Sequence, residues 1–371
     1  MSTSLITIMR SIIFMVIGLV VFAVYLYYFV GVSQILDVLE NLNSAQYAFY
    51  YSLAILAVLG SVFCWSAAWN SILRTLSINI SYRKSYLYYW VGNFADLILP
   101  CATVCGELTR FYLVKKETTE SYGAIASSAV TNRLVAYTIV TSGLYLGAGY
   151  VLFRPNVPPL ITNIFILLMA GDTAYMAVLL LLAFSKGSSD KIAALYFKIN
   201  KRIRPSKATP DNLMKTKQTL ASFYEGFQIF RKNPQSLIRP FIFHAFAYVL
   251  GLLVFVFIFF ALGIPAASPG FYIAVYFIAT SFQDASASLS VGSLDILLST
   301  IFILYGISSG NSGVAAVILR SALFWFPLLV GFICVQFVGA KVLVTGKPKK
   351  GSEISDGIID KSPPSVSETE T

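Results

Sequence analysis

Long apolar runs separated by shorter polar segments divide most of the chain. A helix that crosses a bilayer needs about 20 mainly apolar residues. Uninterrupted runs of this kind lie at residues 11–30, 47–69, 124–152, 160–184, 240–262 and 313–343. Two further apolar regions, at residues 86–114 and 271–310, are broken by polar residues. The pattern predicts an all-α polytopic membrane protein with about six full spans and two interrupted regions.

The first interrupted region, at residues 86–114, is too short for two crossings. Its 29 residues fall short of the roughly 40 that two spans need at about 20 each. Pro100 breaks it near the middle, and it carries Asp96, Glu107 and Arg110. We therefore expect a re-entrant helical hairpin, whose irregular backbone is tolerated only where protein or a wet cavity covers it.

The second interrupted region, at residues 271–310, is broken at residues 283–288 and again at 292–295. These breaks contain Asp284 and Asp295. By length, the region fits either a hairpin or two crossings. Two crossings would leave the polar break on the inside without any basic residue, against the positive-inside rule. We therefore favour a second re-entrant hairpin that begins and ends outside.

Basic residues predict the orientation. Of the 27 Lys and Arg residues, 12 lie in the loop at residues 185–239, and loops of this kind face the cytoplasm and its anionic lipids. Arg83 and Lys115 flank the first hairpin, so both of its ends are expected on the cytoplasmic side. The loop at residues 31–46 is acidic and is expected outside. The chain is then a multi-pass protein of the cell membrane with both termini in the cytoplasm.

The basic loop and the C-terminal tail are expected outside the bilayer core. Residues 190–200 and 212–232 have amphipathic patterns typical of helices on a membrane surface, and a solvated loop is the alternative. Residues 346–371 are rich in Ser, Asp and Glu, which predicts a disordered cytoplasmic tail. Residues 1–345, including the basic loop, form one transmembrane domain.

Composition narrows the classes of function. The chain is 57% hydrophobic and 12% charged, whereas soluble domains are about one quarter charged. The net charge of +10 is concentrated in the basic loop, which argues against nucleic acid as a partner. The sequence has no GxxxxGK[ST] run, so ATP-driven pumping is not expected. The single histidine, His244, and the four cysteines form no metal-binding motif, and Cys101 and Cys105 are expected to be packing residues. We expect neither a metal nor a cofactor.

The two interrupted regions begin two similar units. Each has a broken hairpin with a glycine and an acid, then a loop, then a long span with one arginine. Glu107 precedes Arg133 by 26 residues, and Asp295 precedes Arg320 by 25. Since the units enter from opposite sides, we interpret them as an inverted repeat, a transporter plan in which the site lies where the units meet. Chance similarity between Ala-rich spans is the alternative.

Charged residues inside these units are the candidates for a site. An arginine within a span costs roughly 2.5–3.5 kcal/mol to insert, so Arg133 and Arg320 need partners. They either bind a phosphate or similar headgroup or form structural ion pairs between hairpin and span, and both roles are compatible. Asp172 is a separate candidate proton carrier, and no catalytic residue is assigned. The candidate substrate-binding residues are Asn93, Asp96, Glu107, Arg110, Arg133, Asp284, Asp295 and Arg320.

The first unit also resembles a known family. The order Asn93, Leu99-Pro100, Gly106-Glu107 and Arg110, followed by an Ala/Ser-rich helix that reaches Arg133, is similar to the transmembrane domain of lysylphosphatidylglycerol synthases. The similarity covers roughly residues 4–345. It implies a flippase-like domain. Lipid-modifying members carry an additional soluble aminoacyl-transferase domain that this sequence does not contain, so the resemblance implies lipid binding or translocation rather than aminoacyl-lipid synthesis.

We therefore expect a non-enzymatic membrane protein that binds a phosphate-bearing lipid or lipid-linked headgroup and moves it between leaflets. Two other classes stay open: a membrane transferase acting on a lipid carrier, and a non-catalytic partner of a lipid or glycan transferase. The expected ligands are membrane lipids, anionic or phosphate-bearing. A homo-oligomer and a complex with a transferase are both compatible with the sequence.

Overall fold

A computed structural model describes residues 32–99, 104–153, 157–184, 210–265, 267–285 and 290–345, with the single residues 16, 20, 23, 24, 27 and 28. All regular structure within these residues is helical. The helices are α2 (Val32–Glu40), α3 (Ser44–Thr75), α4 (Tyr82–Ile98), α5 (Val104–Glu117), α6 (Tyr122–Leu152), α7 (Pro159–Phe184), α9 (Pro210–Lys232), η3 (Pro234–Leu237), α10 (Ile238–Ala261), α11 (Pro269–Ala285), α12 (Ser290–Leu304), α13 (Ser309–Arg320), η4 (Ser321–Trp325) and α14 (Phe326–Thr345).

Five helical segments of the described residues are long and apolar enough to cross a membrane. They are α3, α6, α7, α10 extended by η3, and the segment Ser309–Val338, which joins α13 to the first part of α14. Each matches one of the predicted apolar runs. The prediction of an all-α polytopic membrane protein is therefore confirmed. The run at 11–30 and the amphipathic stretch at 190–200 lie outside the continuously described residues.

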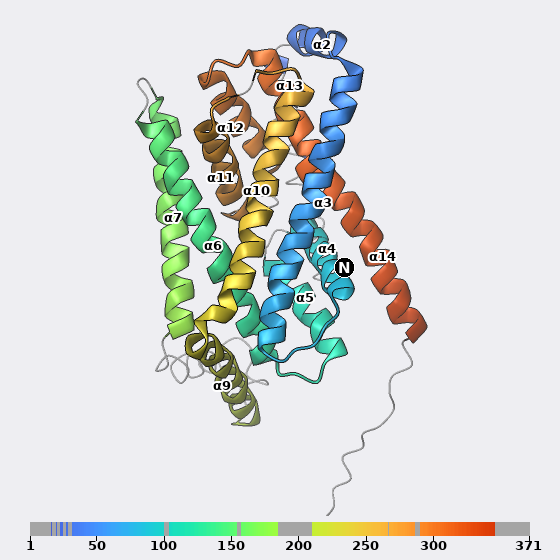
Figure 1. The fold of residues 1–371 in the computed structure, drawn as a ribbon, viewed down its shortest axis with the longest axis vertical. Coiled ribbons are helices and arrows are strands. Elements are labelled where there is room, and N and C mark those ends of the chain that lie inside the picture. The colour runs from blue at the N-terminus through green and yellow to red at the C-terminus, as the bar shows by residue number, and fades with distance from the viewer. Residues whose placement is uncertain are drawn as a thin grey trace, which may run out of the picture.

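Four shorter helices form two consecutive pairs, α4–α5 and α11–α12. With 14 to 17 residues each, none reaches the about 20 residues of a full crossing. The partners within each pair pack against one another. Figure 1 shows α4 and α5 in the half of the molecule that also contains α9, and α11 and α12 in the half nearer α2. The two pairs thus occupy opposite ends of the bundle.

Polar caps place the starts of the helices around these pairs. An N-cap side chain accepts a hydrogen bond from a backbone N–H that has no partner within the helix. Asn43, Ser81, Ser121 and Ser308 do so at the starts of α3, α4, α6 and α13, with distances of 3.1 to 3.4 Å. Three of the four caps directly precede a helix that carries a charged residue of the predicted site.

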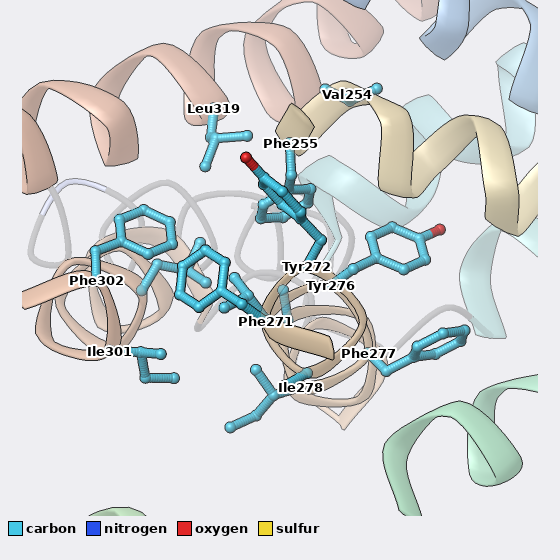
Figure 2. Close-up of a cluster of buried hydrophobic side chains, with 14 of the residues drawn as sticks. Val254, Phe255, Phe271, Tyr272, Tyr276, Phe277, Ile278, Ile301, Phe302 and Leu319 are labelled. Atoms are coloured by element: carbon cyan, nitrogen blue, oxygen red, sulfur yellow. The ribbon is translucent and has the colours of Figure 1, made fainter. Parts of the chain in front are cut away.

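The main apolar core surrounds α11. Figure 2 shows aromatic and aliphatic side chains that project from α11 among side chains of α10, α12 and α13. The ring of Phe271 lies 6.1 Å from that of Phe302 on α12, and the ring of Tyr276 lies 5.8 Å from that of Phe255 on α10. Such aromatic pairs stabilise packing by about 0.5–1.5 kcal/mol beyond the area they bury. These aromatic contacts therefore hold the first half of α11 in the apolar core. The last turn of α11 carries polar side chains and faces the interior of the bundle.

The structure differs from the sequence-based expectations at three places. The loop expected at residues 31–46 contains α2, because Ile35 and Val38 lie on one helical face that packs against the core. The run at 313–343 is interrupted by η4, a π-helical turn directly after Arg320. Cys105 takes part in a disulfide bond, so the prediction that it is only a packing residue is wrong.

Candidate functional site

The predicted site residues converge on one internal cavity of about 260 Å³. Its walls come from α3, α4, α5, α6, α10, α11, α12 and α13, from the π-helical turn η4 and from the start of α14. All eight predicted substrate-binding residues line it: Asn93, Asp96, Glu107, Arg110, Arg133, Asp284, Asp295 and Arg320. Residues from both predicted units therefore share one polar space inside an apolar bundle. Whether they bind a substrate stays a prediction.

Arg133 forms an ion pair across the first unit. Its Nε atom on α6 donates to the carboxylate of Glu107 on α5. Its Nη1 atom donates to the hydroxyl of Tyr175 on α7, at 2.7 Å. The side chains of Arg133 and Glu107 keep 14% and 16% exposure, so the pair is partly open to the cavity. Hydrogen bonds to two other helices hold the guanidinium in a fixed direction.

Arg320 forms the corresponding pair in the second unit. Its Nε lies 2.8 Å from Oδ1 of Asp295, and its Nη2 lies 2.8 Å from Oδ2. This two-point contact between α13 and α12 is the strong geometry for a guanidinium and a carboxylate. Asp295 also accepts a bond from the N–H of Gly292 at 3.0 Å. Gly292 has a φ of 82°, which L side chains rarely adopt. The glycine in the predicted break therefore directs the chain so that its amide reaches Asp295.

Arg110 is held differently. Its guanidinium is buried and lies over the ring of Tyr89, with 4.2 Å to the centroid, and 5.7 Å from that of Trp69. Cation–π contacts stabilise such a charge, more strongly when water is excluded. On the described residues no ion pair is formed by Arg110. On α5, Glu107 thus pairs with an arginine of another helix. One turn later, Arg110 stacks on aromatic rings instead of pairing with a carboxylate.

Asp96 and Gly106 join α4 to α5. The Gly106 N–H donates to Oδ1 of Asp96 at 2.6 Å. A Cβ atom at Gly106 would lie 2.1 Å from Oδ2 of Asp96 and 2.5 Å from the carbonyl oxygen of Gly92. Only glycine therefore allows the two helices to approach this closely. This contact explains why a glycine precedes Glu107, and it fixes Glu107 at the cavity wall.

Asp284 and Asp172 lie at the boundary between α6, α7 and α11. The hydroxyl of Tyr137 donates to Oδ2 of Asp284 at 3.1 Å. The hydroxyl of Ser281 donates to Oδ2 of Asp172 at 2.7 Å. Asp172 is buried but is not among the residues that line the cavity. The candidate proton carrier therefore lies outside the cavity lining but contacts α11, the helix that carries Asp284.

Sequence reasoning missed several polar residues of the site. His244 is buried on α10, and its Nε2 lies 3.0 Å from Oδ1 of Asn132, the residue before Arg133. Tyr137 and Tyr175 supply the hydroxyls that contact Asp284 and Arg133. Tyr137 follows Arg133 by four residues, which places both on one helix face. That spacing was visible in the sequence, whereas the positions of His244 and Tyr175 depend on which helices are neighbours.

Ionised side chains dominate the polar part of the cavity lining. Within the described residues, no group of three or more His, Cys, Asp and Glu side chains is placed to hold a metal ion. The cavity walls carry three guanidinium groups and four carboxylates among mainly apolar side chains. Such a lining suits a ligand with a charged headgroup, since paired guanidinium groups recognise phosphate and carboxylate oxygens.

Comparison with known proteins assigns the family. The model of the lysylphosphatidylglycerol synthase TM region matches residues 15–331. A UPF0104 membrane protein of Pyrococcus horikoshii is 25% identical over 297 residues, which cover 76% of this chain and 85% of the relative. No solved structure matches the chain significantly. The matched region contains every residue of the cavity described above. The chain is therefore a multi-pass membrane protein that belongs to the family of lysylphosphatidylglycerol synthase transmembrane regions.

Proposed function

We propose that the protein binds a phosphate-bearing lipid or lipid-linked headgroup in the central cavity and translocates it across the bilayer. One observation carries this proposal: Arg133 and Arg320, 187 positions apart in the sequence, line the same cavity inside an apolar bundle. Charged side chains inside a membrane are costly and generally mark a pathway or a binding site. The family supports a lipid ligand, because its description names a phospholipid synthase.

The proposal includes the topology of six spans and two re-entrant hairpins in an inverted repeat. The opposite placement of the pairs α4–α5 and α11–α12 supports it (Figure 1). So does the parallel pairing of each arginine with a carboxylate on the second helix of the preceding pair, at separations of 26 and 25 residues. The headgroup site then lies where the two units meet, as in other inverted-repeat transporters.

Charge placement supports the orientation in the cell membrane. Lys115 and Lys116 end α5, Arg231 and Lys232 end α9, and these helices lie in the same half of the molecule (Figure 1). Basic residues favour the cytoplasmic side. The acidic α2 lies at the other end of the molecule. Both termini would then be cytoplasmic, and the protein would act without a catalytic residue or a nucleotide.

The exposed ion pair of α4 and α5 provides a matched control for the test. Lys84 and Glu117 lie 2.9 Å apart, and their side chains keep 45% and 29% exposure. Replacing both residues, as in Lys84→Met/Glu117→Gln, removes one ion pair outside the cavity. The same operation inside the cavity is Glu107→Gln/Arg133→Met. Because each double substitution removes both members of an ion pair, neither leaves one member of that pair buried without the other, which would itself destabilise the protein.

The experiment measures translocation of fluorescent phosphatidylglycerol in vesicles that contain the purified protein. We expect the wild type and the Lys84/Glu117 variant to translocate the lipid, and the Glu107/Arg133 variant to lose most of this activity while it stays folded. Activity equal to that of protein-free vesicles in the wild type would contradict the proposal. Undiminished activity in the Glu107/Arg133 variant would show that this pair only locks the hairpin to the span. Activity that appears only with an added transferase would favour the role of a transferase partner.

A further inference from the structure

Two carboxylates, of Glu107 and Asp284, lie near the guanidinium of Arg133, and Asp172 lies near Asp284. Glu107 pairs with Arg133 directly. Arg133 also attracts the carboxylate of Asp284, which is repelled by Asp172 and Asp96. With Glu107, Asp284 and Asp172 all ionised, this cluster would carry two more negative than positive charges. A buried carboxylate without a cation is so costly that it binds a proton instead.

Hydrogen bonds and a ring contact among α6, α7 and α11 place Asp172 and Asp284 in one region. Ser281, which donates to Asp172, lies one turn before Asp284 on α11, so both side chains lie on the same helix face. Tyr137 on α6 donates to Asp284. Its ring lies 4.7 Å from that of Tyr175, which is one turn beyond Asp172 on α7. The two carboxylates therefore belong to one compact cluster rather than to separate sites.

Little positive charge faces this cluster to compensate the negative charge of its carboxylates. From α6 it faces Arg133 and Tyr137, from α7 Tyr175, from α4 Asp96, and from α10 Tyr248. Tyr276 faces it from its own helix. On the neighbouring helices α12 and α13, Asp295 is paired with Arg320. Arg133 is thus the cation that acts on Asp284, and it already has a carboxylate partner.

We propose that Asp284 and Asp172 form a proton-binding site that holds one proton at neutral pH, and that an anionic headgroup in the cavity strengthens the binding of this proton. The proton comes from water and binds to a carboxylate oxygen of the pair, and its release restores a negative charge beside Arg133. That charge repels an anionic headgroup, so proton release and headgroup release accompany one another. This link rests on the proposed function, whereas the proton site itself does not.

Linkage gives the direction of the pH dependence. If the headgroup-bound state holds one more proton than the empty state, binding tightens as the pH falls and weakens as the pH rises. For one linked proton the change is at most about tenfold per pH unit. The substitution Asp172→Asn/Asp284→Asn makes both groups permanently neutral, with nearly unchanged shape. It should abolish the pH dependence without unfolding the protein.

Infrared difference spectroscopy of the reconstituted protein tests the proton site without any added ligand. We expect the wild type to show the carbonyl band of a protonated carboxyl group at neutral pH, and to lose it at alkaline pH. The Asp172/Asp284 double variant should lack the band. The control is Asp37→Asn, which changes an exposed carboxylate of α2 and should keep it. A wild type without the band, or a double variant that retains it, would overturn the proposal.

A pH profile of translocation then tests the link to the headgroup. We expect transport of phosphatidylglycerol by the wild type and by Asp37→Asn to fall from neutral to alkaline pH. Transport by the double variant should not change over this range. A wild-type profile without pH dependence would overturn the link. A wild type that transports no lipid at any pH would instead contradict the proposed function, and the infrared band would still decide whether the pair binds a proton.

Discussion

The guanidinium of Arg320 contacts both carboxylate oxygens of Asp295, with Nε 2.8 Å from Oδ1 and Nη2 2.8 Å from Oδ2. The two side chains retain only 7% and 2% exposure. Twenty-five residues separate them in the sequence, and they join α13 to α12 at the cavity wall. Arg133 and Glu107 form a similar pair that also lines the cavity. The Arg320–Asp295 pair leads to a prediction about stability.

Removing one member of the Arg320–Asp295 pair should cost more than removing both. Arg320→Met leaves the Asp295 carboxylate buried without its cation, which destabilises a protein by about 3–5 kcal/mol. Asp295→Asn/Arg320→Met removes this penalty and should be the more stable variant. Thermal unfolding in detergent measures the difference. Equal melting temperatures for the single and double variants would show that the pair is not energetically coupled.

Gly106 should not tolerate a methyl group. In Gly106→Ala the new Cβ would lie 2.1 Å from Asp96 and 2.5 Å from the backbone of Gly92, so α4 and α5 would have to separate. We expect a lower melting temperature and loss of lipid translocation. Gly149→Ala on α6 is the control, because nothing lies within 4 Å of its Cβ position. There alanine should stabilise the helix by up to about 1 kcal/mol. Similar behaviour of the two variants would contradict the close contact.

The hydroxyl of Tyr175 should orient Arg133 toward the cavity. Tyr175→Phe removes the acceptor that lies 2.7 Å from Arg133 Nη1, and a hydrogen bond to a charged group contributes about 1.5–3 kcal/mol. We expect the lipid concentration that gives half-maximal translocation to rise. Tyr145→Phe is the matched control between the same two helices, since the Tyr145 hydroxyl contacts Thr173 at 2.9 Å on the exposed side. An equal effect of both changes would exclude an orienting role for Tyr175.

Both ends of the α4–α5 hairpin should face the same side of the membrane. Single cysteines at Arg83 and Lys115 should react with a membrane-impermeant maleimide only from the cytoplasmic side, and a cysteine at Glu40 only from outside. The unsubstituted protein gives the background from its own cysteines. Opposite accessibility of the positions Arg83 and Lys115 would rule out re-entry, and the inverted repeat with it.

The lengths of the apolar runs predicted most of the membrane-spanning helices. The runs at 47–69 and 124–152 lie within α3 and α6, because about 20 apolar residues have few alternatives to a membrane helix. The helix α2 was missed, because the sequence of these nine residues with a few apolar positions is also compatible with a loop. The helix is identified only by the packing of Ile35 and Val38 against the core. The π-helical turn after Arg320 was also missed, because the local sequence carries no signal for it.

The site was partly predictable for the same reason. Charges inside apolar runs stand out, and the spacing between Glu107 and Arg133 and between Asp295 and Arg320 predicted the two pairs that the structure contains. Hydroxyl and imidazole groups do not stand out in this way. Ser281 and His244 acquire their roles only from the packing of α11 against α7 and of α10 against α6, which no local pattern specifies.

The most direct test of the central claim is native mass spectrometry of lipids that stay bound to the purified protein. We predict that the wild type and the Lys84→Met/Glu117→Gln control retain a phosphate-bearing lipid, and that Glu107→Gln/Arg133→Met loses it. Equal retention by all three proteins, or retention only of lipids without phosphate, would contradict a headgroup site built around Arg133.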